Sequence, residues 1–130
     1  QSAPPSIHPQ GRRYRRDELI QAAGARPQLL NDAISTGLLQ ASETYGERSL
    51  TLLRALVALD RHGIEPRHLR SMRQSAERDV ALIETSLAPL LRRQDPSARA
   101  TAHEVGPELA RRLDEVRAVF VRAALTRLLP

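Results

Sequence analysis

Arginine side chains carry most of the chemistry that the sequence offers, because all 20 basic residues are arginine and none is lysine. A planar guanidinium binds phosphate well, and two groups of arginines are spaced to do so. One group flanks Tyr14. It could be a basic arm that neutralises nucleic-acid phosphates, or part of a solvated linker. The arginines of the other group recur at every third position. They could form a basic ridge that binds DNA or an acidic partner, or they could pair with nearby acidic residues at the surface. The first group is Arg12, Arg13, Arg15 and Arg16, and the second is Arg67, Arg70 and Arg73.

Residue patterns typical of catalysis or metal binding are missing from the sequence. There is no cysteine, which excludes thiolate nucleophiles, disulfides and Cys-ligated metals. No two histidines lie four residues apart around an acid, as zinc-binding helices require. Neither a Gly-rich phosphate loop nor a Gly-x-Ser-x-Gly nucleophile turn occurs. We therefore expect no enzymatic activity, no cofactor and no metal. The histidines considered are His8, His62, His68 and His103.

The composition favours packed helices. Leucine and alanine fill 38 of the 130 positions, whereas only three residues are aromatic. Strands prefer β-branched and aromatic residues, so we expect an all-α fold. The formal net charge of +5 is compatible with phosphate contacts but does not require them. No stretch approaches the roughly 18 consecutive apolar residues of a membrane-spanning helix, so no membrane partner is expected.

The N-terminal segment differs from the rest of the chain. Residues 1–13 include several prolines and serines and lack hydrophobic periodicity, which is typical of a linker between domains. The chain starts at Gln1 rather than methionine, and this segment lacks the apolar core of a secretory signal. We expect a linker over residues 1–13 within a longer, cytoplasmic protein.

Three short helices are expected in the first half of the chain. Gly24 and Gly37 are stop signals for the first two, and Pro27 suits the first position of the second. Two short helices joined by a tight turn are a helix-turn-helix candidate. The polar stretch before the third helix has hairpin length, where a tiny β-wing would sit. The expected helices span about residues 16–23, 27–36 and 47–62, with the wing over 40–47.

Two long helices are expected in the second half. One starts at Glu65-Pro66, and we expect Pro89 to kink or end it. The other starts at Asp95-Pro96, with Gly106-Pro107 as a break near its beginning. Each carries an apolar stripe at alternating spacings of three and four residues. The stripes are Leu69, Met72, Ala76, Val80, Ile83, Leu87 and Leu90, and then Val105, Leu109, Leu113, Val116, Phe120 and Ala123, with Leu128 as a further candidate of the second stripe.

Apolar stripes of this size must pack against something. They could form the core of one chain, as a helical hairpin or bundle, or part of them could pair with a second copy. The residue pattern leaves both uses open. The packing is expected to rest on Val80, Ile83, Leu87, Val116 and Phe120.

Several residues of these elements follow one another in a characteristic order. Glu18-Leu19 and Gly24 belong to the first helix, Leu30, Ile34 and Gly37-Leu38-Leu39 to the second, and Tyr45, Leu50, Leu53 and HGIEPRHLRSM follow. This order resembles the winged-helix DNA-binding head of the MerR family of bacterial transcription regulators. More narrowly, GIEPRHLR followed by IETSLAPLLRRQDP resembles the C-terminal half of actinobacterial FtsR-like regulators of that family.

The resemblance implies a C-terminal regulatory and dimerisation domain over residues 14–130, with a degenerate head (14–73) and a long helical pair (74–130). A homodimer would then position two DNA-reading heads that lie upstream of this chain. Asp32 and Glu43, on the expected recognition helix and wing, repel phosphate, so we expect DNA to be bound mainly by the upstream domain. Residues left as DNA-contact candidates are Arg12, Arg13, Arg15, Arg16, Arg26, Asn31, Tyr45 and Arg48.

Three alternatives remain open for this domain. It could be a second, weak DNA-binding head that adds non-specific affinity. It could be a sensor that holds a small molecule or a peptide between the head and the long helices. It could also be an adaptor whose apolar stripe docks another protein, such as polymerase.

Overall fold

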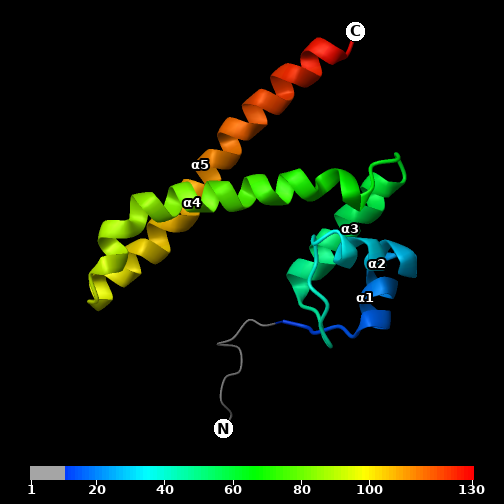
Figure 1. Ribbon diagram of the computed structural model, residues 1–130, viewed down its shortest axis with the longest axis horizontal. Helices are drawn as coiled ribbons and strands as arrows, with labels where there is room; N and C mark the ends of the chain where they lie inside the picture. Colours follow the sequence, from blue (N-terminus) through cyan, green and yellow to red (C-terminus); the bar gives the residue numbers. More distant parts are fainter. Residues whose placement is uncertain (1–10) are drawn as a thin grey trace. The chain divides into compact units, whose positions relative to one another are not determined.

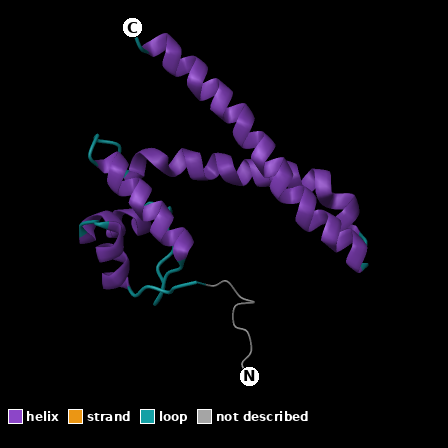
Figure 2. Cartoon of the chain, turned by 180° about the vertical axis from the view of Figure 1, so that it is seen from behind, coloured by secondary structure: helices purple, strands orange, loops and turns teal. Residues whose placement is uncertain are grey.

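The computed structural model describes residues 11–130, and these residues form helices and loops without any β-strand (Figures 1 and 2). The expected all-α fold is therefore confirmed. The chain divides into two compact units, one extending to Arg73 and the other spanning Gln74–Pro130. Most of the predicted linker, residues 1–10, lies outside the described residues. The helical elements are α1 (Arg16–Ala23), α2 (Pro27–Ser35), α3 (Glu47–Asp60), the 3-10 helix η2 (Pro66–Leu69), α4 (Arg70–Arg92) and α5 (Pro96–Leu128).

The first unit begins with the predicted pair of short helices. Helix α1 ends at Gly24, whose φ of 68° is the left-handed conformation that glycine adopts without strain. Three residues later Pro27 takes the first position of α2, where its missing N–H removes no helical hydrogen bond. The short turn between the two helices, which the sequence predicts, follows from these two residues.

A single apolar core holds the first unit together. Leucines from α1, α2 and α3 interdigitate there, and the most deeply buried ones are less than 2% exposed. Half-buried residues of the loop after α2, and Leu69 of η2, pack around this core. The buried members are Tyr14, Leu19, Ala23, Leu29, Leu30, Ala33, Tyr45, Leu50, Leu53 and Leu56.

The predicted wing is reduced to one antiparallel bridge between Tyr14 and Tyr45. Each residue donates its N–H to the other's carbonyl, at 2.8 Å in both cases. The Tyr14 hydroxyl donates to Glu47 (3.2 Å), and the Tyr45 hydroxyl accepts from the backbone N–H of Ser42 (3.1 Å). The segment before α1 is thus fastened to the loop before α3 without a sheet.

Helix α4 does not end at Pro89, one of the two outcomes expected from the sequence, but continues to Arg92. A proline lacks only its own N–H, so the helix forfeits one hydrogen bond, to the carbonyl of Thr85. Because Pro89 lies in the last turn, the missing hydrogen bond affects only the few helical residues that follow it. Burial of Leu87, two residues earlier, holds this end of α4 in place.

Helix α5 likewise runs through Gly106-Pro107 without the expected break. Leu87 of α4 lies beside this point: its Cδ1 atom is 3.5 Å from the position that a Cβ on residue 106 would take, an ordinary van der Waals distance. The two helices therefore pack closely at this point, and the packing offsets the hydrogen bond that Pro107 cannot make. They form the expected hairpin, joined by a tight turn (Figure 1).

Asp95 starts α5, as the sequence predicts. Its carboxylate accepts the backbone N–H of Ala98 at 2.6 Å, which caps the helix. This hydrogen bond, assisted by Arg93, lowers the pKa of Asp95 below its ordinary value of 3.8. Within the second unit only Leu87, Ala98 and Ala102 are buried, so the hairpin has a small core.

No helix among residues 11–130 combines the length and the apolar content that crossing a membrane requires.

Candidate functional site

The arginines before α1 are exposed, and two of them are held in defined positions. The guanidinium of Arg12 lies over the ring of Tyr14, 4.8 Å from its centroid, as a cation–π contact. Arg13 donates to the hydroxyl and to the backbone carbonyl of Thr44, at 3.0 and 3.1 Å. The predicted basic arm is thus partly ordered against the loop that precedes α3.

The other predicted DNA-contact residues have different fates. Arg15 is exposed, and its backbone N–H donates to Glu18 at 2.8 Å. Arg16 of α1 donates to the side-chain oxygen of Asn31 on α2, so these two candidates bind each other. Arg48 is exposed at the start of α3.

The expectation that Tyr45 contacts DNA is wrong for this fold. Its side chain is only 4% exposed and belongs to the core of the first unit. The bridge to Tyr14 turns the ring inward, and the hydroxyl is already used by Ser42. In a sequence without an alignment, an isolated tyrosine beside a glycine gives no sign of which way it points.

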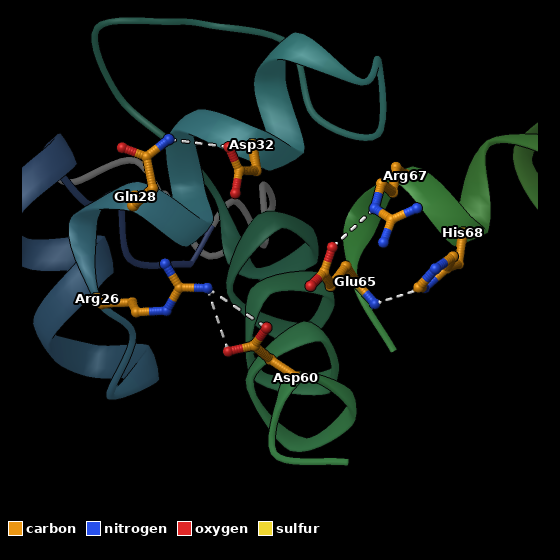
Figure 3. Close-up of polar contacts among 7 residues, drawn as sticks. All are labelled: Arg26, Gln28, Asp32, Asp60, Glu65, Arg67 and His68. Carbon is orange, nitrogen blue, oxygen red and sulfur yellow. Dashed lines mark hydrogen bonds and ion pairs between the residues drawn. The ribbon is translucent and has the colours of Figure 1, made fainter. Parts of the chain in front are cut away.

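The surface of α2, the expected recognition helix, is occupied by internal polar contacts (Figure 3). Arg26, just before α2, forms an ion pair with Asp60 at the end of α3, with an N–O distance of 3.3 Å. Gln28 donates to Asp32 one turn later, at 2.9 Å. The one arginine predicted to contact DNA from this helix is therefore directed toward a carboxylate of its own chain.

A second polar group surrounds η2 (Figure 3). Arg67 donates to Glu65 at 2.8 Å and thereby holds the pKa of that carboxyl below its ordinary range. The Nδ1 atom of His68 accepts the backbone N–H of Glu65, at 2.9 Å, which caps the short helix. Arg73 donates to the carbonyl of Gly37 at the end of the α2 turn. Two arginines of the predicted basic ridge thus bind groups of their own unit.

One pocket of the first unit combines exposed arginines with hydroxyl groups. It measures about 640 Å³ and lies beside the start of α3, with Arg13 and Arg48 in its wall. A Cβ on Gly46 would lie 2.8 Å from the Nη1 atom of Arg13, so glycine lets the guanidinium approach the backbone at the start of α3. The N-terminal end of a helix is itself positive and adds to the two guanidiniums, while Glu47 in the same wall offsets part of this charge. Hydroxyl or amide groups are added by Gln40, Ser42, Thr44 and Ser49.

The second unit presents an apolar face that the rest of this unit does not cover. On α5 the stripe packs in its first turns, where Ala98 and Ala102 are buried and Val105 is half-buried. The same spacing of three and four residues continues to Val116 and Phe120, which are 51% and 68% exposed. The face of α5 that packs against α4 therefore continues along α5 beyond the part that α4 covers.

The five predicted packing residues divide between these two parts. Leu87 is buried within the hairpin and Ile83 is half-buried. Val80 is 60% exposed on α4, and Val116 and Phe120 are exposed on α5. The spacing of apolar residues could not distinguish buried from exposed stripe residues, because the spacing is the same in the covered and the uncovered part of α5.

The sequence analysis missed a second apolar face near the end of α5. Its residues lie away from the stripe and are each about half exposed or more. The sequence signals this face by runs of consecutive apolar residues, Val119 to Val121 and Leu128-Leu129. Consecutive residues point to different sides of a helix, so one face cannot hold them all. The last four turns of α5 are thus apolar on two sides. This second face comprises Val121, Leu125 and Leu128, and the assignment of Leu128 to the stripe is therefore corrected.

Comparison with known proteins places these observations in a family. Residues 12–129 match the family described as "Rv1828-like, C-terminal domain". The chain is also 29% identical over 107 residues to the HTH-type transcriptional regulators Rv1828 of Mycobacterium tuberculosis and Mb1859 of Mycobacterium bovis. These alignments cover 81% of this chain but 43% of each regulator. Since the family match spans nearly the whole chain, the protein belongs to the Rv1828-like C-terminal domain family.

Proposed function

We propose that this chain is the non-catalytic assembly and regulatory domain of a cytoplasmic helix-turn-helix transcription regulator, MerR-like and of the actinobacterial FtsR-like kind. Two copies associate through the helical hairpin of α4 and α5. The relatives that the chain resembles are named as HTH-type regulators, and the chain corresponds to less than half of their length. In this proposal DNA is read by heads outside the present domain.

The single observation that carries the proposal is the exposed continuation of the α5 stripe. Val116 and Phe120 follow the residues that pack on α4 in unbroken three-and-four spacing, yet no other part of the second unit covers them. A second copy of the same helix has the matching apolar stripe, which makes a self-complementary two-fold interface. Aromatic residues at the centre of such interfaces contribute most to binding, and Phe120 is the only aromatic residue of this unit.

Dimerisation would act on DNA binding indirectly. Two linked heads meet the two half-sites of an operator at a spacing that the dimer fixes. Linking two binding modules raises overall affinity by about 10² to 10⁴ without any new DNA contact. An effector that changed the hairpin would change that spacing, which is the regulatory role proposed here.

Sedimentation velocity over a concentration series tests the assembly. We expect the wild-type chain to dimerise and Phe120→Arg to weaken the dimer by at least about 30-fold, the effect of losing one central anchor. Because Phe120 is exposed in the single chain, the helix content of the variant should equal that of the wild type. Ala100→Arg, also exposed on α5 but away from the stripe, adds the same charge and should leave the dimer intact. A wild-type chain that stays monomeric at about 100 μM would contradict the proposal.

A second candidate function, weak DNA binding by the first unit, is favoured by one observation. Arg13 lies against the start of α3 and Arg48 lines the same pocket, so two guanidiniums outnumber the one carboxylate of Glu47 where a phosphate group would be attracted. Fluorescence anisotropy with specific and scrambled DNA at two salt concentrations tests it. Non-specific binding should be salt-sensitive and should weaken for the double variant Arg13→Ala/Arg48→Ala, with a salt slope reduced by about 2. The matched control is Arg99→Ala/Arg111→Ala in the second unit, and equal losses from both pairs would reject the pocket.

A further inference from the structure

We propose that the ion pair between Asp79 of α4 and Arg117 of α5 is a switch: it holds the two helices in a crossed arrangement and so keeps the end of the α5 stripe uncovered. The consequence for a second copy rests on the proposed dimer. The pair joins α4 to α5 far from the turn of the hairpin. The side chains are 24% and 42% exposed, so the pair is partly shielded from water. Hydrogen bonding to Asp79 raises the pKa of Arg117 above its ordinary range.

The residues through which α4 faces α5 do not follow the apolar stripe of α4. Counted away from the turn, they are spaced four apart: Leu87 is buried, Ile83 is half-buried, and Asp79 follows in contact with Arg117. The stripe would instead continue through Val80, which is 60% exposed. A charged residue thus takes the position that faces α5, while its apolar neighbour stays uncovered.

Helix α5 shows the same exchange. Leu113 is half-buried, and four residues later Arg117 contacts α4 in place of the stripe residue Val116. Val116 is 51% exposed, and the next stripe residue, Phe120, is 68% exposed. At this level of the hairpin each helix therefore directs a charge toward the other and leaves an adjacent valine uncovered.

These two sets of positions correspond to two ways of packing helices. Rows of residues four apart, packed against each other, make helices cross at about −50°, so that their ends diverge. Alternating spacings of three and four align helices at about +20° over their length, as in coiled coils. Helices α4 and α5 separate toward the end of α5, as the first mode requires (Figure 1). The stripes permit the second mode, in which Val80 would cover Val116 and Ala76 would cover Phe120.

The ion pair decides between these two arrangements. Aligning the stripes turns each helix by one residue, about 100°, and so takes Asp79 and Arg117 out of contact. The buried core of the hairpin is confined to Leu87, Ala98 and Ala102, so little burial opposes this change. The crossed arrangement leaves the end of the α5 stripe free for a second copy. The aligned arrangement covers it within one chain and prevents the proposed dimer.

An intrachain disulfide reports which arrangement is present, because the sequence has no cysteine. Ala76→Cys/Phe120→Cys sets one cysteine on each stripe, three residues beyond the ion pair on either helix. Loss of Phe120 also removes the anchor of the proposed dimer, so the measurement follows the single chain. Adding Asp79→Ala should speed the disulfide at least about tenfold, because alignment brings the two Cα atoms within the about 7 Å that a disulfide tolerates.

The matched control for this experiment is Asp114→Ala. Asp114 also pairs with Arg117, at 3.0 Å, but it lies on the same helix and cannot hold α4. Asp114→Ala should therefore leave the rate of crosslinking unchanged. Equal rates with and without Asp79 would overturn the proposal, and so would an Asp114→Ala variant as fast as Asp79→Ala.

Sedimentation of Asp79→Ala in the chain that retains Phe120 tests the consequence for assembly. Alanine is a good helix former, so the helix content should persist. If about nine chains in ten align, the apparent dissociation constant of the dimer rises about 100-fold, because both copies must be in the competent form. Asp79→Arg/Arg117→Glu restores an ion pair and should dimerise more tightly than Asp79→Arg alone.

The failure of the switch is distinguishable from the failure of the dimer. An Asp79→Ala variant that dimerises like the wild type would overturn the switch and leave the dimer in place. A wild-type chain that stays monomeric would reject the proposed function instead, and the crosslinking rates would still decide what the ion pair does.

Discussion

Tyr14 and Tyr45 exchange backbone hydrogen bonds of 2.8 Å in both directions, and both rings are buried in the core of the first unit. Two segments 31 residues apart are thereby joined at the point where the chain enters the folded domain. The arginines that could contact phosphate, Arg12 and Arg13, are positioned by this bridge. The stability of the first unit and the order of its basic arm are thus linked.

Replacing Tyr45 should therefore destabilise the first unit. Tyr45→Ala removes a buried ring and should lower the free energy of unfolding by about 3 kcal/mol, as for other buried aromatic residues. Tyr14→Phe keeps the ring but loses the hydroxyl bond to Glu47, and should cost about 1 kcal/mol. Urea unfolding followed by circular dichroism measures both. If the two variants were equally stable, the rings would not form the core described here.

Gly106 offers a stabilising substitution within the hairpin. Gly106→Ala should raise the stability of the second unit by about 0.5–1 kcal/mol, because glycine is unfavourable inside a helix. The added methyl group would lie 3.5 Å from the Cδ1 atom of Leu87, an ordinary van der Waals contact.

The opposite sign is expected at Gly24, which serves as the control. Its φ of 68° suits glycine, so Gly24→Ala should destabilise the first unit by about 1 kcal/mol. Thermal unfolding of both variants decides the matter. A lower melting temperature for Gly106→Ala would mean that α4 and α5 approach more closely than the structure has them.

Leu87 and Val80 belong to the same sequence stripe but should respond differently to truncation. Leu87 is 9% exposed, so Leu87→Ala should destabilise the hairpin by about 2 kcal/mol. Val80 is 60% exposed, so Val80→Ala should change stability by less than about 0.5 kcal/mol in dilute protein. Chemical denaturation at low concentration compares them. Equal costs would show that Val80 is covered within the single chain.

The helix boundaries that could be predicted are those set by local chemistry. Gly24 ends α1, Pro27 starts α2 and Asp95 caps α5, because each satisfies or omits a backbone hydrogen bond within a few residues. Pro89 and the Gly106-Pro107 pair misled the sequence analysis because local rules predict breaks there. Packing of Leu87 against α5, a contact between distant residues, keeps both helices continuous.

The candidate sites were less predictable for the same reason. Side-chain type identified Arg12, Arg13 and Arg48 as exposed cations, since arginine is mostly found at the surface. It could not show that Arg26 binds Asp60, or that Arg16 binds Asn31, because those partners lie 34 and 15 residues away. Nor could it show where α4 stops covering α5, which depends on how two helices cross.

Asp95 should make the start of α5 sensitive to acid. Its pKa is lowered chiefly by the hydrogen bond from the N–H of Ala98, so the folded state favours the ionised carboxylate. The resulting stabilisation is complete well above the ordinary value of 3.8 and is lost as the pH falls through that value and then through the lower value of the folded state. Asp95→Asn still caps the helix but cannot ionise, so it should remove this part of the pH dependence. Melting temperatures of both proteins between pH 3 and 7 measure the difference, which should be largest near neutrality and shrink toward pH 3. A constant difference across that range would show that the charge of Asp95 does not contribute to the cap.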